Sequence, residues 1–157
     1  MKKIKTKCHL CNVTTKSEET PEICPQCGTS WTEPGETVAK MAYGQYVTGK
    51  VYGGWDGHLY LTNKRLFFYK ISKIGSGAGG AVGGLVGGLI EGAINAVQRG
   101  EAIAFSLGYN EIASVEIRKR GLFGKDLFIN STDGESRKIQ IGKIALWEAA
   151  INEVIPK

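Results

Sequence analysis

Histidine is scarce in this sequence of 157 residues, which contains only two. The two histidines, His9 and His58, lie far apart, and no Ser-His-Asp set or carboxylate pair appears. The glycine-rich region lacks the Gly-Lys-Ser/Thr ending of a phosphate-binding loop. We therefore expect a protein that is not an enzyme, with no catalytic residues and no small-molecule substrate.

A secretory signal is also missing. The first residues, MKKIKTKCHLC, are basic but contain no apolar run of seven or more residues. The sequence therefore predicts an intracellular, cytoplasmic protein, which at most associates peripherally with the inner face of the membrane.

Cysteine is absent after residue 27, and its four occurrences form two Cys-x-x-Cys pairs separated by twelve residues. This spacing is typical of a four-thiolate zinc site, which is a closed tetrahedron without an open position for catalysis. The Cys-Pro-x-Cys-Gly half resembles zinc ribbons, and Gly28 would allow a positive φ in the turn. We predict a zinc ribbon over residues 1–32 that holds one structural zinc ion through Cys8, Cys11, Cys24 and Cys27.

Disulfide formation and redox chemistry are two other uses of such cysteines, and both are less favoured here. Disulfides are disfavoured in an intracellular protein, and redox Cys-x-x-Cys motifs rarely occur in pairs. His9 could replace one thiolate, but its place inside the knuckle favours a solvent-facing side chain. A chain of about thirty residues cannot build an adequate core, so metal binding would supply most of the folding energy of the ribbon.

Acidic residues are scarce in one segment only. Residues 37–73 hold six basic residues against Asp56, whereas residues 1–36 hold five lysines against five glutamates. The net charge of +5 therefore belongs to the middle of the chain, where it would attract phosphate groups of lipid or nucleic acid. The zero balance of the ribbon and its single aromatic residue, Trp31, argue against a strong hold on nucleic acid.

Charge is missing altogether between Lys73 and Glu91, where glycine fills eight of seventeen positions. On a helix, two rows of glycine would form a smooth face that lets another backbone approach closely. Eight interior glycines also make an isolated helix in water unfavourable, at about 1 kcal/mol each. We interpret the segment as an element for assembly or membrane association: a helical hairpin or packed helix starting near Val82, or a flexible loop that orders on a partner. Its candidate contact residues are Gly79, Gly80, Gly83, Gly84, Gly87 and Gly88.

A β-hairpin is predicted in the middle of the chain. Residues 57–62 and 65–71 are rich in aromatic and branched side chains and are joined by Asn63-Lys64. The run Gly-x-Leu-Tyr-Leu-Thr-Asn-Lys-Arg-Leu-Phe-Phe-Tyr, residues 57–69, resembles the signature hairpin of the GRAM and bacterial pleckstrin-homology-like families. The resemblance covers residues 35–157 apart from a glycine-rich insertion at about 74–100. It implies an α+β, mainly β, fold: a partly open antiparallel barrel of seven strands capped by a C-terminal helix, with a non-enzymatic binding role.

The second half of the chain continues this pattern. Alternation predicts strands over 112–118 and 126–131 and around Ile139 and Ile141, with a turn at Asp133-Gly134. From Lys143 the apolar period becomes helical and places Trp147 in the core.

The loop of residues 118–125 combines four cations with Leu122 and Phe123. These two side chains would either dip into a membrane below headgroups held by the cations, or fold back onto the barrel. The second alternative is slightly favoured, just as solvation is favoured over lipid contact for the lysines near strand ends. The candidate lipid- or phosphate-binding residues are Lys50, Lys64, Arg65, Lys70, Lys73, Arg118, Lys119, Arg120 and Lys125.

Three functions follow as hypotheses. The first is a binding module for anionic lipid at a membrane surface. The second is a module for protein interaction or homo-oligomer formation through the glycine-rich segment. The third and lowest is nucleic-acid binding through the zinc ribbon.

Overall fold

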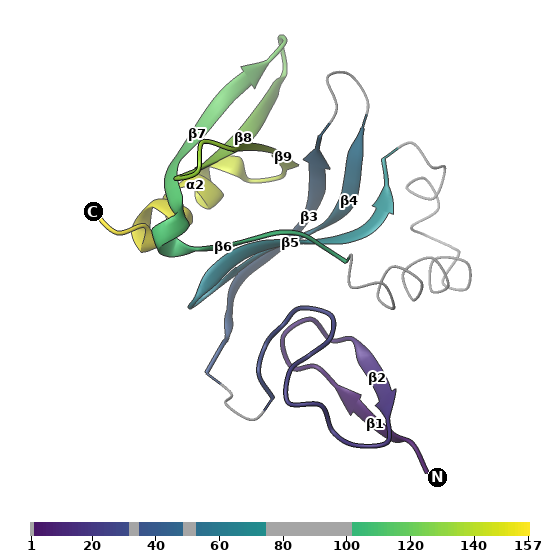
Figure 1. Ribbon diagram of the computed structural model, residues 1–157. Helices are drawn as coiled ribbons and strands as arrows, with labels where there is room; N and C mark the ends of the chain where they lie inside the picture. The colour runs from purple at the N-terminus through teal and green to yellow at the C-terminus, as the bar shows by residue number, and fades with distance from the viewer. Residues whose placement is uncertain (1, 32–34, 49–52, 75–101) are drawn as a thin grey trace.

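The computed structural model describes residues 2–31, 35–48, 53–74 and 102–157 (Figure 1). These residues form a two-stranded sheet near the N-terminus, a seven-stranded sheet, and a helix at the C-terminus. The expectation of a mainly β fold with a C-terminal helix is therefore confirmed.

The small sheet belongs to the cysteine-rich region. Strand β1 (Ile4–Lys7) pairs antiparallel with β2 (Thr14–Ser17), and the two enclose the first Cys-x-x-Cys pair. The second pair lies in a loop that is closed by a bridge between Ile23 and Ser30. We call residues 2–31 the ribbon.

The large sheet is antiparallel and runs in the order β6-β5-β4-β3-β9-β8-β7. Each half is a meander, and the long strand β3 joins them because it pairs with both β4 and β9. The sheet is not closed, since β6 and β7 form its two edges and each has one strand neighbour among the described residues. The strands are β3 (Val38–Val47), β4 (Gly54–Thr62), β5 (Arg65–Lys73), β6 (Ile103–Gly108), β7 (Ile112–Arg120), β8 (Gly124–Ser131) and β9 (Ser136–Ile141).

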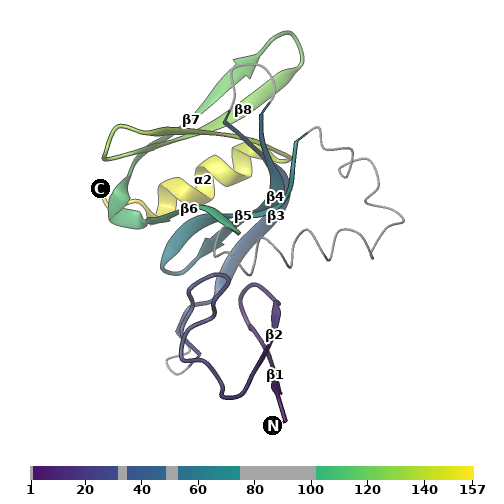
Figure 2. The ribbon, with the colours of Figure 1, turned by 45° about the vertical axis from the view of Figure 1, so that its right-hand side comes forward.

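The core lies on the inner face of this sheet, beneath the helix α2 (Ile144–Val154) (Figure 2). Leu59 and Leu61 point inward from β4 and Leu66 and Phe68 from β5, and all four are at most 2% exposed. Trp147 and Ile151 of α2 close the core from the other side and are 1% and 0% exposed. The predicted alternation of the hairpin and the placement of Trp147 in the core are both confirmed.

Gly57 opens the hairpin motif for a steric reason. A Cβ atom there would lie 1.9 Å from the carbonyl oxygen of Tyr69 on the neighbouring strand. The pairing of β4 with β5 shifts register between Asp56 and Gly57, so the backbones approach closely at this bulge. Only glycine fits without moving β5.

The predicted strand boundaries are partly wrong. Strand β7 extends to Arg120 and strand β8 begins at Gly124. The expected loop over 118–125 is therefore mostly paired strand, with a turn of three residues. All four cations of this region therefore lie on strands, three on β7 and Lys125 on β8. The sequence analysis also did not predict the edge strand β6 or the central strand β3.

The glycine-rich segment lies outside the described residues, and so do the assembly residues proposed in it. Its flanks are neighbours, because β5 and β6 pair antiparallel and the amide of Lys70 donates to the carbonyl of Ala102 at 2.7 Å. The described flanks of the segment therefore lie close together. In the part of the chain that the structure describes, no helix has the length and apolar character needed to cross a membrane.

Candidate metal centre and the contact beside it

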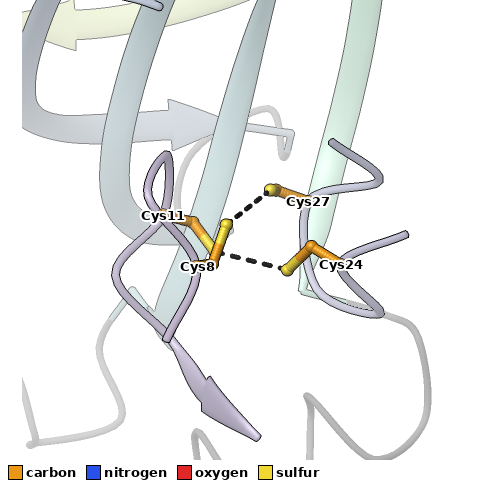
Figure 3. Close-up of side chains that lie close together, drawn as sticks. All are labelled: Cys8, Cys11, Cys24 and Cys27. Atoms are coloured by element: carbon orange, nitrogen blue, oxygen red, sulfur yellow. Dashed lines mark hydrogen bonds between the residues drawn. The ribbon is translucent and has the colours of Figure 1, made fainter. Parts of the chain in front are cut away.

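The four cysteines of the ribbon converge on one point (Figure 3). Their Sγ atoms all lie within 4.8 Å of one another, with 3.7 Å between Cys8 and Cys27 and 3.8 Å between Cys11 and Cys24. A regular tetrahedron with zinc–sulfur bonds of about 2.3 Å has sulfur–sulfur edges of about 3.8 Å. The cluster therefore fits one tetrahedral metal ion, and zinc is the ion that this donor set favours.

The electrostatics of the cluster also favour a bound cation. Hydrogen bonds with Cys24 and Cys27, together with burial, raise the pKa of the Cys11 thiol. The pKa of Cys24 is lowered because Cys11 and Cys27 donate hydrogen bonds to its thiolate. Cys11 and Cys24 therefore do not ionise together by themselves, whereas a divalent ion would favour the thiolate form of its ligands.

Two similar turns hold the cysteines in place. In the first turn, the amide of Cys8 donates to the carbonyl of Val13, and the amide of Asn12 donates to the carbonyl of Cys8. In the second turn, the amide of Cys24 donates to the carbonyl of Thr29, and the amide of Gly28 donates to the carbonyl of Cys24. The residue after each pair has a positive φ, 61° at Asn12 and 71° at Gly28. The predicted role of Gly28 is confirmed, and Asn12 takes the same role because asparagine tolerates this conformation. His9 is exposed and lies outside the cluster, as expected.

The ribbon packs on the outer face of the large sheet. Cys8, Leu10, Cys24 and Cys27 form one buried cluster with Tyr60 of β4 and Phe67 of β5. The rings of Tyr60 and Phe67 are stacked with 4.9 Å between centroids, and these residues are 5% and 0% exposed. We call this contact the seam. It makes the metal centre part of a second hydrophobic core.

Arg65 joins the two parts of the seam through polar contacts. Its Nε atom lies 2.7 Å from Oε1 of Glu36, and its guanidinium also donates to the backbone carbonyl of Cys27. The guanidinium carbon lies 4.5 Å from the ring centroid of Phe67. Gln26 adds a side-chain hydrogen bond of 2.8 Å to the hydroxyl of Tyr69. The hairpin residue after the Asn63-Lys64 turn thus contacts a metal-ligand residue directly.

Glu36 is ionised in this setting. Burial alone would raise its pKa, but hydrogen bonds from Arg65 and Thr62 outweigh burial, and the net pKa lies below the usual value. A carboxylate with a lowered pKa stabilises the folded state above its unfolded pKa. The pair therefore contributes fully at neutral pH and loses its contribution as the pH falls through the folded pKa of Glu36.

The structure separates the predicted lipid-binding cations into groups. Lys64 and Arg65 lie at the seam end of β5, whereas Lys73 ends the strand, roughly 25 Å away along nine extended residues. Lys70 and Lys73 lie over the ring of Trp55, with Nζ 4.3 Å and 5.5 Å from its centroid. Lys50 lies outside the described residues. One continuous site for all of these cations is therefore not formed.

The β7–β8 hairpin carries the other group of cations, at the end of the molecule remote from the ribbon (Figure 1). We call residues 118–125 the tip. Arg118 pairs with Glu116 at 2.9 Å, and Arg120 lies 3.7 Å from the buried Asp126. Lys119 and Lys125 are exposed cross-strand partners, an arrangement of like charges that destabilises a hairpin locally.

Leu122 and Phe123 occupy the turn of the tip. They are 92% and 99% exposed, the highest values among the exposed large hydrophobic residues of the described chain. The slightly favoured expectation that they fold back onto the barrel is wrong. The turn holds only three residues between the strands, and the hairpin extends beyond the sheet surface, so no core atoms lie within reach.

The two short strands of the ribbon carry a cationic face that the zero charge balance of residues 1–36 does not predict. The register of β1 and β2 places Lys5 opposite Lys16 on one face, and Lys3 and Lys7 follow on that face by alternation. All four are exposed, and no ion pair to them occurs within the described residues. Glu36, which lies outside the ribbon, pairs with Arg65 and so does not neutralise this face. The zero balance of residues 1–36 thus conceals a separated cationic face.

Comparison with known proteins shows a likeness to solved structures and no family. The chain matches no protein-family profile and no curated protein. It is similar to the crystal structure of the C-terminal domain of an unknown protein from Leishmania infantum, with a TM-score of 0.52 and 15% sequence identity. The match covers 78% of this chain and 87% of the other chain. At this identity the likeness concerns the fold alone.

Proposed function

We propose that this protein is a non-enzymatic module that binds anionic membrane surfaces through the tip, with the zinc ribbon as a structural part of the same unit. The observation that carries the proposal is the full exposure of Leu122 and Phe123 in a turn flanked by cations. Soluble surfaces rarely keep two adjacent large apolar side chains in water without a partner.

The energetics suit reversible binding. Burying a leucine or phenylalanine side chain contributes about 1.5–3 kcal/mol, and each cation near an anionic surface contributes about 1 kcal/mol. Lys119 and Lys125 have no ion pair among the described residues and are exposed. Two inserted side chains and two to four cations therefore add up to a weak to moderate affinity, typical of peripheral association.

The strand order supports the pleckstrin-homology-like part of this proposal. Seven antiparallel strands in a sheet that is not closed, with a C-terminal helix on its inner face, agree with the fold that the hairpin resemblance implies. In this arrangement the ribbon lies on the outer face of β4 and β5 and away from the tip (Figure 2). A membrane contacted by the tip would therefore leave the ribbon facing away from the bilayer.

Vesicle co-sedimentation tests the proposal. Wild type should bind vesicles that contain phosphatidylserine and bind neutral phosphatidylcholine vesicles much more weakly. Leu122→Ser with Phe123→Ser should reduce binding to anionic vesicles at least tenfold, because about 3 kcal/mol of insertion is lost. Lys119→Glu with Lys125→Glu should remove the preference for anionic lipid.

The matched control is Leu146→Ser, which replaces an exposed leucine (55% exposed) on α2. This variant should bind like wild type. Equal vesicle binding by the tip variant and this control would contradict membrane association through the tip. Equal binding of wild type to neutral and anionic vesicles would contradict the role of the cations.

Assembly through the glycine-rich segment is the second candidate function, and it remains a hypothesis because that segment lies outside the described residues. Light scattering of the intact chain and of a 75–92 deletion would test it. Loss of an oligomer in the deletion would support assembly, and a monomer in both would contradict it.

Nucleic-acid binding through the ribbon is the weakest candidate, although the lysine face of β1 and β2 favours it. This face has no aromatic side chain for base stacking, so binding would rest on phosphate contacts alone. Four such contacts predict a slope of about −3.6 for log Kobs against log salt on duplex DNA. Fluorescence anisotropy should give this slope for wild type and about −1.8 for Lys5→Gln with Lys16→Gln; no binding at low salt would exclude the function.

A further inference from the structure

A cavity of about 450 Å³ lies at the edge of the seam, between the second cysteine turn and the start of β5. Its walls are residues 28–30 of the ribbon, Glu36 before β3, Lys64 and Arg65 at the hairpin turn, and Gly108 at the end of β6. Its volume falls within the range of small-ligand sites, roughly 300–1,000 Å³. It lies at the end of β5 opposite Lys73 and is thus separate from the tip.

The acceptors of this cavity are already occupied. Oε1 of Glu36 accepts from Nε of Arg65 at 2.7 Å and from the hydroxyl of Thr62 at 2.9 Å. Oε2 accepts from the Nη2 atom of Arg65 at 3.3 Å. The carboxylate therefore neutralises Arg65 and has little capacity left for a ligand.

The donors, by contrast, are in surplus. The Lys64 ammonium is exposed and forms no hydrogen bond or ion pair with the described residues. Nη1 of Arg65 has one long contact, 3.3 Å to the hydroxyl of Ser106. Thr29 is 2% exposed, and its hydroxyl lies near enough to Glu36 to help lower the pKa of that carboxyl, but it forms no hydrogen bond of good geometry within the described chain. A buried hydroxyl without a well-placed partner is unfavourable, so it points to an acceptor that is supplied from outside.

We propose that this cavity binds a small oxyanion, a phosphate or carboxylate group, between the ribbon and the sheet. The group accepts hydrogen bonds from the Thr29 hydroxyl on one side and from Lys64 and Arg65 on the other. With Glu36 paired to Arg65, the walls carry a net charge of +1, which suits one anionic group and not a polyanion. Because the ligand contacts both the ribbon and the large sheet, its binding stabilises the docked arrangement of the ribbon.

Thermal unfolding and calorimetry with inorganic phosphate test the site on the full, zinc-loaded chain. Phosphate strengthens apolar burial in any protein, so the comparison is between variants at matched ionic strength and not between salts alone. We expect calorimetric binding to wild type, at least tenfold weaker binding to Lys64→Ala, and several-fold weaker binding to the near-isosteric Thr29→Val. Lys125→Ala, which removes an exposed cation of the tip, should bind phosphate like wild type.

Two results would overturn the site: no calorimetric binding to wild type, or equal binding to wild type and Lys64→Ala. Lys64 is exposed, so its variant should keep the zinc content and circular dichroism of wild type, and loss of binding would then not reflect unfolding.

Phosphatidic acid vesicles distinguish the two sources of the phosphate group. If the ligand is soluble, Lys64→Ala should leave vesicle binding unchanged. If the ligand is a lipid headgroup, Lys64→Ala should weaken vesicle binding, and inorganic phosphate should compete with the vesicles for wild type. Calorimetric binding of inorganic phosphate is independent of membrane binding by the tip, which the variant of Leu122 and Phe123 tests.

Discussion

Replacing Cys24 by alanine is expected to detach the whole ribbon from the sheet. Cys24 is 1% exposed and supplies one corner of the tetrahedron, so its loss leaves three ligands and an open coordination position. In small zinc modules the free energy of metal binding, about 10–16 kcal/mol, is the free energy of folding. Loss of zinc should therefore unfold residues 2–31 and uncover the stacked pair Tyr60 and Phe67, which are at most 5% exposed in the folded chain.

Three measurements should agree for this variant. Zinc content should fall from one ion per chain to nearly none, a protease should cut within residues 2–31, and a dye for exposed apolar surface should bind. Addition of a strong chelator to wild type should reproduce all three results. Thr14→Ala, an exposed change on β2, is the matched control and should behave like wild type.

The large sheet should survive this loss, because its inner core is separate from the seam. Leu59, Phe68, Leu127 and Trp147 belong to the inner core, and none of them contacts the ribbon cluster. Hydrogen exchange should remain slow in β8 and β9 and become faster in β4 and β5. Uniform unfolding of the chain would contradict the division into two cores, and a protease-resistant ribbon without zinc would contradict the structural role of the metal.

Replacing Arg65 by alanine is expected to give the second large effect. Its side chain is 18% exposed and that of Glu36 is 8% exposed, so removal of the guanidinium leaves a buried carboxylate without its partner. Breaking a buried pair on one side destabilises a protein by about 3–5 kcal/mol, and the stacking of Arg65 on Phe67 is lost as well. We expect a decrease of about 3 kcal/mol in the free energy of unfolding at neutral pH, measured with urea.

Arg118→Ala is the matched control for this prediction. Arg118 also pairs with a glutamate, at 2.9 Å, but the two side chains are 52% and 46% exposed. Such an exposed pair contributes about 0–1 kcal/mol. Adding Glu36→Gln to the Arg65 variant should restore part of the stability, since the buried charge is then removed. Equal destabilisation by the two arginine variants would show that Arg65 is not a link across the seam.

The pH dependence of the Arg65 variant follows from the lowered pKa of Glu36. The stabilisation by the pair is complete above the unfolded pKa of the carboxyl group, about 4.3 in model peptides, and disappears below its folded pKa. The difference in stability between wild type and Arg65→Ala should therefore be greatest at neutral pH and should shrink as the medium becomes acidic.

Much of the local structure could be predicted from residue patterns. Spacing identified the four cysteines of the candidate metal centre, because a Cys-x-x-Cys turn is a local geometry that needs no distant contact. Alternation identified the hairpin around Asn63-Lys64, and helical periodicity identified α2 with Trp147 on its buried face. In each case the information lies within about fifteen residues of the chain.

The seam was missed, although one signal for it was present. Tyr60 and Phe67 interrupt the alternation of Leu59, Leu61, Leu66 and Phe68, so both strands read as continuous apolar runs. Such runs are typical of strands that are buried on both faces. Alternation predicts that one face of β4 and β5 packs on the barrel core and identifies no partner for the opposite face. In the structure the ribbon covers that opposite face.

Cationic residues were the least predictable part. Lys64, Arg65 and Lys73 were grouped because they are near in sequence, yet a strand separates its ends by about 3.3 Å per residue. In the fold, Arg65 belongs to the seam, Lys73 lies over Trp55, and the tip joins Lys119 to Lys125 from two strands. The exposure of Leu122 and Phe123 also depends on how far the β7–β8 hairpin extends past the sheet, which no local pattern encodes.

The amino-acid sequence alone determined the metal ligands, the hairpin, the alternation that builds the inner core, and the C-terminal helix, since short-range geometry and periodicity govern these features. Tertiary structure alone decided that the ribbon shares a core with β4 and β5, that Arg65 and Glu36 meet across 29 positions, and that Thr29 and Lys64 line one cavity. These features depend on long-range packing of apolar surface, and the pairing of buried charge follows from which surfaces that packing brings together.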